Sequence, residues 1–310
     1  MDRVGLVSML SKPCAELGDR VALSKILSIA EVNSLKALIT LSECLVREPK
    51  SAVIGITGPQ GVGKSTIISC LIRELSSRGY RVAALLVDPS SPLTGGAVLG
   101  NRLRMADLPS DTFARSIWAE DERSIPLRAV TSLEVLESAG YDFIFVETPG
   151  AGQVNTGILR VSDVVVVVLM PFLGDEVQVI KAGLMEIGDI YVVNKADVPE
   201  ADLMYGYVKS LVKDKPVVKI SALYRKNVGE LIETIRVELE RRDLKGERVR
   251  KRVERRKYIV EETLVELLHQ LVREELSTVG GEELLKNPSD FTDLLRGLKT
   301  RLAKRIVEGP

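Results

Sequence analysis

The chain has 310 residues, 45% of them hydrophobic and 28% charged, and its 43 basic and 43 acidic residues give a formal net charge of zero. A chain without net charge has no overall field that attracts nucleic acid, so we expect no nucleic-acid partner. The chain has one histidine, His269, and three scattered cysteines, Cys14, Cys44 and Cys70. This content excludes zinc fingers, disulfide frameworks and metal sites built from several imidazoles or thiolates. It favours a cytoplasmic protein in which the thiols are reduced.

Residues 1–49 are predicted to form a helical N-terminal extension. Apolar side chains recur there at steps of three and four residues, which is the period of one helix face. The members of this stripe are Leu35, Leu38, Ile39, Ser42, Leu45 and Val46. Pro49 is expected to end the helix, because proline cannot continue the helical hydrogen-bond pattern.

From residue 50 to residue 240, short apolar runs alternate with helical stretches. The runs are continuously apolar and rich in β-branched residues, as are the strands of a parallel sheet that is covered on both faces. They are Ala52–Thr57, Val82–Val87, Tyr141–Val146, Val164–Met170, Ile190–Val193 and Val217–Ile220, and Phe113–Ile117 is a further candidate strand outside this pattern. This pattern predicts a three-layer α/β domain with a mostly parallel sheet. Even the longest run is far shorter than the roughly 20 residues of a membrane span, so we expect no membrane partner.

Residues 241–310 are predicted to form a helical arm. A long helix is expected from Glu247 to Leu276, with an apolar stripe that packs either on its own domain or in a dimer seam. The stripe consists of Val260, Leu264, Leu267 and Leu271. A last helix is expected to start at Asn287–Asp290. Arg241–Lys257 contains ten basic and three acidic residues, which predicts a solvated helix face, with a patch for nucleic acid or another anionic partner as the alternative.

The strongest motif follows the first predicted strand. Eight residues fit the pattern G-x-x-x-x-G-K-[ST], and with the threonine that follows them they lead into a helix that continues to Leu75. These residues, the threonine included, are Gly58, Pro59, Gln60, Gly61, Val62, Gly63, Lys64, Ser65 and Thr66. Such a loop turns its backbone N–H groups toward phosphate oxygens, while the lysine charge reaches the β- and γ-phosphates. We therefore predict a phosphate-binding loop in which Ser65 binds Mg²⁺ and Thr66 reaches the α-phosphate.

A second motif selects the base of the nucleotide. Asn194, Lys195 and Asp197 fit the pattern N-K-x-D directly after a predicted strand. The Asp197 carboxylate can accept two hydrogen bonds from guanine, whereas adenine would leave it buried and unpaired. Asn194 is expected to tie loops together, and Lys195 to stack along the base. The next strand ends in Ser221, Ala222 and Leu223, and with these residues the pattern predicts GTP or GDP rather than ATP.

Two acidic residues follow strands whose carboxyl ends should share one edge of the sheet. Asp88 follows Val82–Val87, and Glu147 follows Tyr141–Val146. An acid at this edge can hold Mg²⁺ directly or through water, and we expect Asp88 and Glu147 to do so with Ser65. Helix capping is the alternative role for Asp88. The N–H of Gly150, which closes the segment that starts at Glu147, is placed to sense the γ-phosphate.

Further segments extend these motifs into a family pattern. They are Val87–Gly96, Leu99-Gly100, Arg104-Met105, Glu147–Gln153 and Gly174–Gly183. Together with the two nucleotide motifs they resemble the MeaB/ArgK family of SIMIBI-class P-loop GTPases, which are similar to the human methylmalonic aciduria type A protein. The resemblance implies a P-loop NTPase fold and a homodimer that chaperones adenosylcobalamin-dependent methylmalonyl-CoA mutase, coupling GTP hydrolysis to cofactor loading and protection. On that basis we expect the arm over residues 241–310 to make the dimer contact.

The chain departs from the family pattern in three loops. It has Asn101-Arg102, Arg115–Arg123 and Val154-Asn155 where the family has other residues. Because these loops are expected to respond to the γ-phosphate or to contact the partner, they bear on the hydrolysis rate and on the choice of partner.

Catalysis is expected to follow the chemistry of phosphoryl transfer. Lys64, Mg²⁺ and backbone amides would neutralise the charge that develops on the phosphate. Gln153 and Asp175 are candidates for positioning the attacking water, and Lys181 for stabilising the charge. For these three residues, ordinary solvated loop positions are the alternative.

The residues and the resemblance together predict a cytoplasmic, Mg²⁺-dependent GTPase that serves a cobalamin-dependent mutase. One alternative is a metal-insertion GTPase of the same class, against which the lack of a His/Cys cluster argues. A second is a phosphotransferase of the ArgK kinase type, for which we find no acceptor site in the sequence. A third is a nucleotide-gated binding module without catalytic activity, which the altered loops favour.

Overall fold

The computed structural model describes residues 18–40, 50–89, 108–119, 125–150, 155–171, 183–277, 292, 295–297 and 299–301. The chain divides into two compact units, Met1–Arg256 and Lys257–Pro310. The sheet belongs to the first unit, and the long helix α12 (Glu247–Ser277) begins in the first unit and continues in the second. Within the described residues, no helix has the length and apolar character needed to cross a bilayer.

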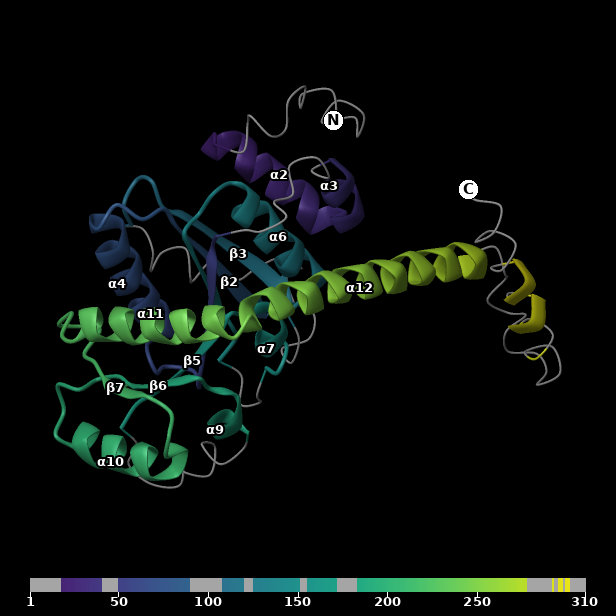
Figure 1. The fold of residues 1–310 in the computed structure, drawn as a ribbon. Coiled ribbons are helices and arrows are strands. Elements are labelled where there is room, and N and C mark those ends of the chain that lie inside the picture. The colour runs from purple at the N-terminus through teal and green to yellow at the C-terminus, as the bar shows by residue number, and fades with distance from the viewer. Residues whose placement is uncertain are drawn as a thin grey trace. The chain divides into compact units, whose positions relative to one another are not determined.

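A seven-stranded sheet forms the centre of the first unit (Figure 1). Its strands are β1 (Ala52–Thr57), β2 (Val82–Pro89), β3 (Phe113–Ala119), β4 (Phe143–Glu147), β5 (Val164–Leu169), β6 (Ile190–Val193) and β7 (Val217–Lys219). They lie in the order β3-β2-β4-β1-β5-β6-β7, and every neighbouring pair is parallel. The six predicted runs and the candidate Phe113–Ile117 are thus all strands, with ends that differ by one or two residues, and the predicted α/β fold is confirmed.

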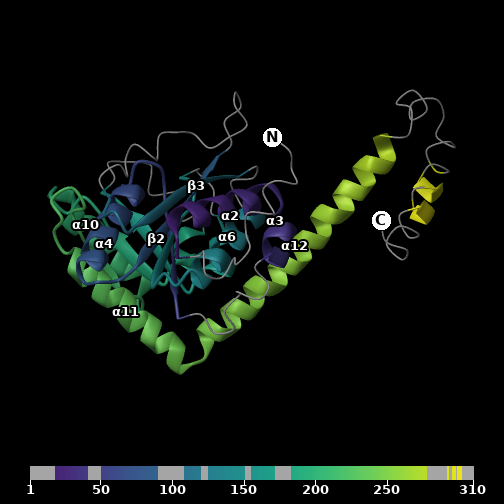
Figure 2. The same ribbon diagram turned by 90° about the horizontal axis from the view of Figure 1, so that it is seen from above.

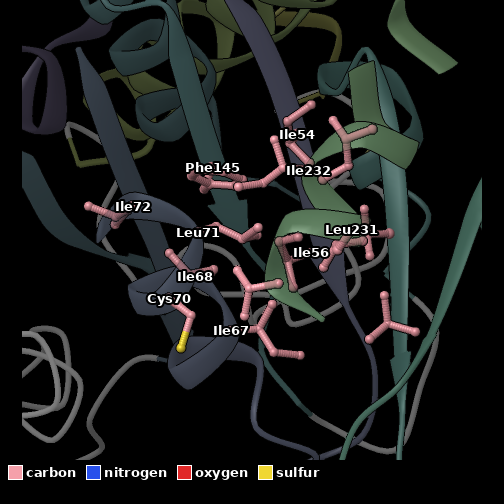
Figure 3. Close-up of a cluster of buried hydrophobic side chains, with 14 of the residues drawn as sticks. Ile54, Ile56, Ile67, Ile68, Cys70, Leu71, Ile72, Phe145, Leu231 and Ile232 are labelled. Carbon is pink, nitrogen blue, oxygen red and sulfur yellow. The ribbon is translucent and has the colours of Figure 1, made fainter. Parts of the chain in front are cut away.

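Helices cover both faces of the sheet. In β1, Ile54 and Ile56 pack in a buried cluster with α4 (Lys64–Ser77) and α11 (Val228–Leu244), as Figure 3 shows. Gly55, between them, faces α7 (Ile158–Val161) on the opposite side, where a Cβ would lie 2.5 Å from Ile158 Cγ1. The other helices pack as follows: α6 (Leu127–Ser138) on β2 and β4, α2 (Arg20–Val32) and α3 (Ser34–Thr40) on α6, α9 (Leu184–Ile187) on β5, and α10 (Glu200–Val212) on β6 and β7.

The strand order places a topological switch point at β1. After β1 the chain moves to β2 and β3 on one side, and it then returns through β4 to build β5, β6 and β7 on the other side. In open parallel sheets, ligands bind outside the carboxyl ends of the strands at such a point. The described residues that follow β1, β4, β6 and β7, together with Asp88 at the end of β2, carry predicted motifs and lie at this carboxyl edge.

The N-terminal extension is helical over residues 20–32 and 34–40, and its first helix buries residues that precede the predicted stripe. The buried side chains of α2 are Ala22, Leu23, Ile26, Leu27 and Ala30. Asn33 separates α2 from α3, which are both labelled in Figure 2. Ile39, a member of the predicted stripe, is 64% exposed, because α3 buries the side that carries Ser34 and Ala37. The stripe is therefore wrong at Ile39, and its members Ser42, Leu45 and Val46 lie outside the described residues.

The basic segment at the end of α11 and the start of α12 is solvated only in part, since Arg241, Lys245 and Arg250 are exposed while other arginines are buried. Arg242, Arg248 and Arg255 are buried in the first unit. Arg242 Nη1 donates to Asp163 O at 2.6 Å, and Arg248 Nη2 donates to Ser51 O at 2.7 Å. Both acceptors immediately precede a strand, so these arginines lie at the amino edge of the sheet.

A buried carboxylate pair on α6 completes this amino edge. Arg255 Nε donates to Glu134 Oε1 at 2.9 Å, and Arg255 also forms an ion pair with Glu137. The side chains of all three residues are at most 2% exposed. The prediction of a solvated helix face failed here because the acidic partners come from a helix more than one hundred residues earlier in the chain.

Candidate functional site

The phosphate-loop motif lies between the end of β1 and the start of α4, where two of its glycines have no room for a side chain. Gly58 has a φ of +145°, and a Cβ there would collide with the carbonyl oxygen of Val168. Gly63 precedes α4 with a φ of +95°, and a Cβ there would collide with the Asn194 amide. Positive φ values and these approaches both require glycine. The loop is thereby packed against the ends of β5 and β6.

Lys64 is the first residue of α4, and its ammonium group lies inside the loop. Its Nζ donates to Gly58 O at 2.9 Å and to Pro59 O at 3.0 Å. Burial lowers the pKa of Lys64, and the nearby Glu147 carboxylate partly offsets that effect. The loop therefore holds a lysine by its carbonyl oxygens, which carry only partial charges and leave the lysine able to pair with an anion. Gln60, Gly61 and Thr66 lie on the exposed rim of the loop.

Ser65 and the two predicted acids form the oxygen-rich part of the site. Ser65 Oγ donates to Glu147 Oε1 at 2.9 Å. Glu147 and Asp88 are both buried, and they lie at the ends of the neighbouring strands β4 and β2, where Leu86 is opposite Glu147. A hydroxyl and two carboxylates are hard oxygen donors of the kind that Mg²⁺ prefers. In the part of the chain that the structure describes, no group of three or more His, Cys, Asp or Glu residues could hold a metal by itself.

Gly150 lies directly against the phosphate loop. A Cβ on this residue would lie 2.7 Å from Gln60 Cα and 2.8 Å from Lys64 Nζ. The segment is anchored by Thr148 Oγ1, which donates to Thr57 Oγ1 at 2.8 Å. Gly150 thus approaches the phosphate loop next to Lys64, where only a residue without a side chain fits.

Asn194 connects the guanine motif to the phosphate loop. Its Nδ2 donates to Val62 O at 2.8 Å, and its Oδ1 accepts from Ala222 N at 3.1 Å. The residue is buried, so both bonds are shielded from water. The expectation that Asn194 ties loops together is confirmed, because this one side chain joins the loops after β1, β6 and β7.

Asp197 and Ser221 lie in contact where the loops after β6 and β7 meet. Ser221 Oγ donates to Asp197 Oδ1, and Ala196 N donates to Ile220 O at 2.9 Å. Lys195 has a left-handed φ of +59° and is exposed beside Asp197, while Leu223 is exposed at the other end of the motif. An exposed carboxylate with a fixed orientation is a suitable acceptor for the edge of a base.

Several predicted residues lie outside the described part of the chain. They are Gln153, Asp175, Lys181, Asn101-Arg102 and Val154. Asn155 is buried beside Gly157, and Arg115 forms an ion pair with Glu31 of α2. Arg115 therefore contacts the N-terminal extension, which is a different role from the partner contact expected of its loop.

Two residues of the site were not predicted from the sequence. Thr57 ends β1 and anchors Thr148, and Cys70 on α4 contacts the loop after β7. The position of Thr57 at a strand end is a local signal that could have identified it. Cys70 has no such signal, because its partner Ala222 is 152 residues away.

Comparisons with known proteins agree with this geometry. The family described as methylmalonyl Co-A mutase-associated GTPase MeaB matches residues 23–277. A protein of Pyrococcus horikoshii named as a GTPase is 40% identical over 233 residues, which cover 71% of this chain and 74% of that protein. The methylmalonic aciduria type A homolog of Mus musculus is 32% identical over 280 residues, which cover 82% of this chain and 67% of that protein.

The solved structure of a LAO/AO transport system kinase shares the fold. It aligns with a TM-score of 0.65 at 22% identity, covering 96% of this chain and 99% of that one. The parallel sheet with its phosphate loop after β1 is therefore of the P-loop NTPase type that the motif predicted.

Proposed function

Because the chain belongs to the MeaB family of methylmalonyl-CoA mutase-associated GTPases, we propose that it hydrolyses GTP with Mg²⁺ and chaperones an adenosylcobalamin-dependent methylmalonyl-CoA mutase. The observation that carries the proposal is the pair of Asn194 hydrogen bonds, one to Val62 and one from Ala222. A side chain that fixes the phosphate loop and the guanine motif relative to each other suits a nucleotide that spans both.

The phosphate loop binds the triphosphate in this proposal. Gly58–Thr66 surround the phosphates with backbone N–H groups, to which the N-terminus of α4 adds positive potential. Lys64 exchanges its contacts with Gly58 and Pro59 for contacts with the β- and γ-phosphates. Thr66, on the exposed rim, reaches the α-phosphate.

The guanine motif selects the base. Asp197 accepts hydrogen bonds from guanine N1–H and N2–H₂, and Ser221 orients its carboxylate. The stem of Lys195 lies along one face of the base, and Ala222 and Leu223 close the pocket. Adenine lacks this pair of donors, so a bound adenine nucleotide would lose both hydrogen bonds.

Ser65, Asp88 and Glu147 would hold Mg²⁺, since they supply one hydroxyl and two buried carboxylates at the same edge. Bound there, Mg²⁺ supplies positive charge to the phosphate oxygens. Lys64 stabilises the charge that develops during transfer, and the N–H of Gly150 lies beside it. In this proposal Gln153 or Asp175 positions the attacking water, and Lys181 stabilises the charge on the transferred phosphoryl group.

A cytoplasmic homodimer is part of the same proposal. The division into an extension (1–49), a GTPase domain (50–240) and a dimerisation arm (241–310) assigns the dimer contact to α12. Support comes from its apolar stripe, of which Val260, Leu264 and Leu267 are exposed. Such a stripe is buried when two helices pack together.

Nucleotide binding and hydrolysis test the catalytic part of the proposal. We expect the purified chain to bind GDP far more tightly than ADP and to hydrolyse GTP only with Mg²⁺. Asp197→Asn should reduce the preference for GDP, whereas Asp202→Asn, at an exposed acid that pairs with Lys219, should not change it. Equal affinities for GDP and ADP in the wild type would contradict the proposal.

Binding to purified methylmalonyl-CoA mutase tests the chaperone role. The mutase is used as a bait with GTP or GDP present, and GTP hydrolysis is measured in parallel. We expect binding that depends on the nucleotide and a mutase-stimulated hydrolysis rate. Neither binding nor stimulation would refute the chaperone role for this partner while leaving the GTPase assignment in place.

A further inference from the structure

Cys70 links the helix of the phosphate loop to the guanine motif. It lies on α4, the helix that starts at Lys64, and it is buried at 8% exposure. Its Sγ donates a hydrogen bond to Ala222 O at 3.3 Å. In Figure 3, Cys70 and Ile72 leave α4 in different directions.

The Ala222 peptide is held from both sides. Its N–H donates to Asn194 Oδ1 at 3.1 Å, and its carbonyl oxygen accepts from Cys70 and, at 3.4 Å, from Arg225 N. Ser221, the preceding residue, bonds Asp197 and pairs with Lys226 in an antiparallel bridge. The position of this peptide therefore determines where the partner of Asp197 lies.

We propose that Cys70 is a positioning residue for guanine recognition, which fixes residues 221–223 relative to the phosphate loop through its bond to Ala222. The inference rests on the proposed function, because it assumes a guanine nucleotide that spans both loops. If the loop is already ordered before the ligand binds, less free energy is spent on ordering it, and the affinity for the ligand is higher. A ligand that occupies only the phosphate loop gains nothing from this order.

The chemistry of the thiol fits this role. Burial raises the pKa of the Cys70 thiol, and Arg225 and Arg73 oppose the rise only in part. A protonated thiol can donate a hydrogen bond, and a thiolate cannot. Serine keeps a donor at this position, whereas valine fills a similar volume without one, so the two substitutions separate hydrogen bonding from packing.

Affinities for GDP and for inorganic pyrophosphate, both with Mg²⁺, test the proposal by calorimetry. We expect Cys70→Val to weaken GDP binding about 3-fold, as loss of one net hydrogen bond does, with pyrophosphate binding unchanged. Cys70→Ser should restore GDP binding to the wild-type value. Ile72→Val is the matched control, because it removes a methyl group from a side chain that leaves the same helix in another direction, and both of its affinities should stay unchanged. Cys70→Ala replaces Cys70→Val if the latter does not fold.

The possible results separate the two proposals. Equal weakening of GDP and pyrophosphate by Cys70→Val, or a Cys70→Ser variant as weak as Cys70→Val, would show a packing role and overturn the positioning role. Unchanged GDP binding in Cys70→Val would overturn it as well. A wild-type chain that binds pyrophosphate but shows no preference for GDP would overturn the proposed function together with this inference.

Discussion

The two edges of the sheet bury positive charge in opposite ways. At the carboxyl edge, Lys64 is held by two carbonyl oxygens of its own loop, Gly58 O and Pro59 O. At the amino edge, Arg255 is held by two carboxylates from another helix, Glu134 and Glu137. Carbonyl oxygens carry only partial charge, whereas a carboxylate carries a full one, so the two edges differ in how firmly their cation is bound.

This difference suits one edge to ligand binding and the other to holding the structure together. A lysine held by neutral groups can exchange them for a phosphate without leaving a charged partner behind. An arginine paired with buried carboxylates cannot leave, because each carboxylate would then be an uncompensated buried charge. The carboxyl edge is therefore suited to a ligand, and the amino edge to anchoring α11 and α12 on the sheet.

The largest effect should follow from breaking the amino edge. Arg255→Met leaves Glu134 and Glu137 buried without their main partner, which should lower the free energy of unfolding by roughly 3–5 kcal/mol. Chemical denaturation measures this change. The affinity of the folded fraction for GDP should be unaltered, because Arg255 lies at the opposite edge from the nucleotide site.

Arg241→Met is the matched control for that substitution. Arg241 comes from the same basic segment and pairs with Glu238 at 2.6 Å, but its side chain is 43% exposed. Its partner Glu238 is 13% exposed but keeps Arg242 at 2.9 Å when Arg241 is replaced, so no unpaired carboxylate results and we expect a change of only about 0–1 kcal/mol. If Arg241→Met and Arg255→Met lowered the free energy of unfolding by similar amounts, the distinction between a solvated and a buried pair would be contradicted.

A second test of the amino edge uses pH. Burial raises the pKa of Glu137 from 4.5 to about 7, although Arg255 and Arg252 act against it. Between these two values the folded chain keeps a proton that the unfolded chain has released, so stability falls as the pH rises toward 7. The decline in the free energy of unfolding should be confined to the interval over which this group titrates.

Glu137→Gln isolates this contribution, since glutamine does not titrate. Urea midpoints measured from pH 5 to pH 8 should decline less steeply for Glu137→Gln than for the wild type. Parallel curves for the two proteins would show that Glu137 titrates normally in the folded state.

Sequence reasoning worked for one edge and failed for the other for a physical reason. Six of the seven strands could be predicted because a continuous run of apolar and β-branched residues is typical of a strand that is buried on both faces. The seventh, β3, contains Arg115 and Ser116 and lacks that pattern. The phosphate loop and the N-K-x-D motif could be predicted because their residues are neighbours in sequence. The amino edge could not, because Arg255 and Glu134 are 121 residues apart, and a run of arginines has the same pattern whether it faces water or buried acids.

The carboxyl edge should respond to mutation in binding more than in stability. Lys64→Ala should weaken GTP binding by about 100-fold, since charged hydrogen bonds to the β- and γ-phosphates are lost. Its loss of unfolding free energy should be smaller than that of Arg255→Met, because the direct partners of Lys64 are neutral carbonyl oxygens. The nearby Glu147 carboxylate keeps its hydrogen bond from Ser65. Calorimetry and denaturation measure the two quantities. A Lys64→Ala variant that binds GTP normally would contradict the assignment of the phosphate loop.

The smallest effect concerns the hydroxyl that we assign to Mg²⁺. Ser65→Ala removes the Oγ that bonds Glu147, and it should weaken GTP binding about 10-fold with Mg²⁺ and hardly at all with EDTA, because only the metal-dependent part of the affinity is lost. Ser69→Ala is the control on the same helix: its Oγ donates to Ser65 O at 2.9 Å, away from the carboxylates. If Ser65→Ala weakened GTP binding equally in Mg²⁺ and in EDTA, Ser65 would have a structural role in the loop. The contrast between an edge with groups available to a ligand and an edge with groups paired to each other would then fail.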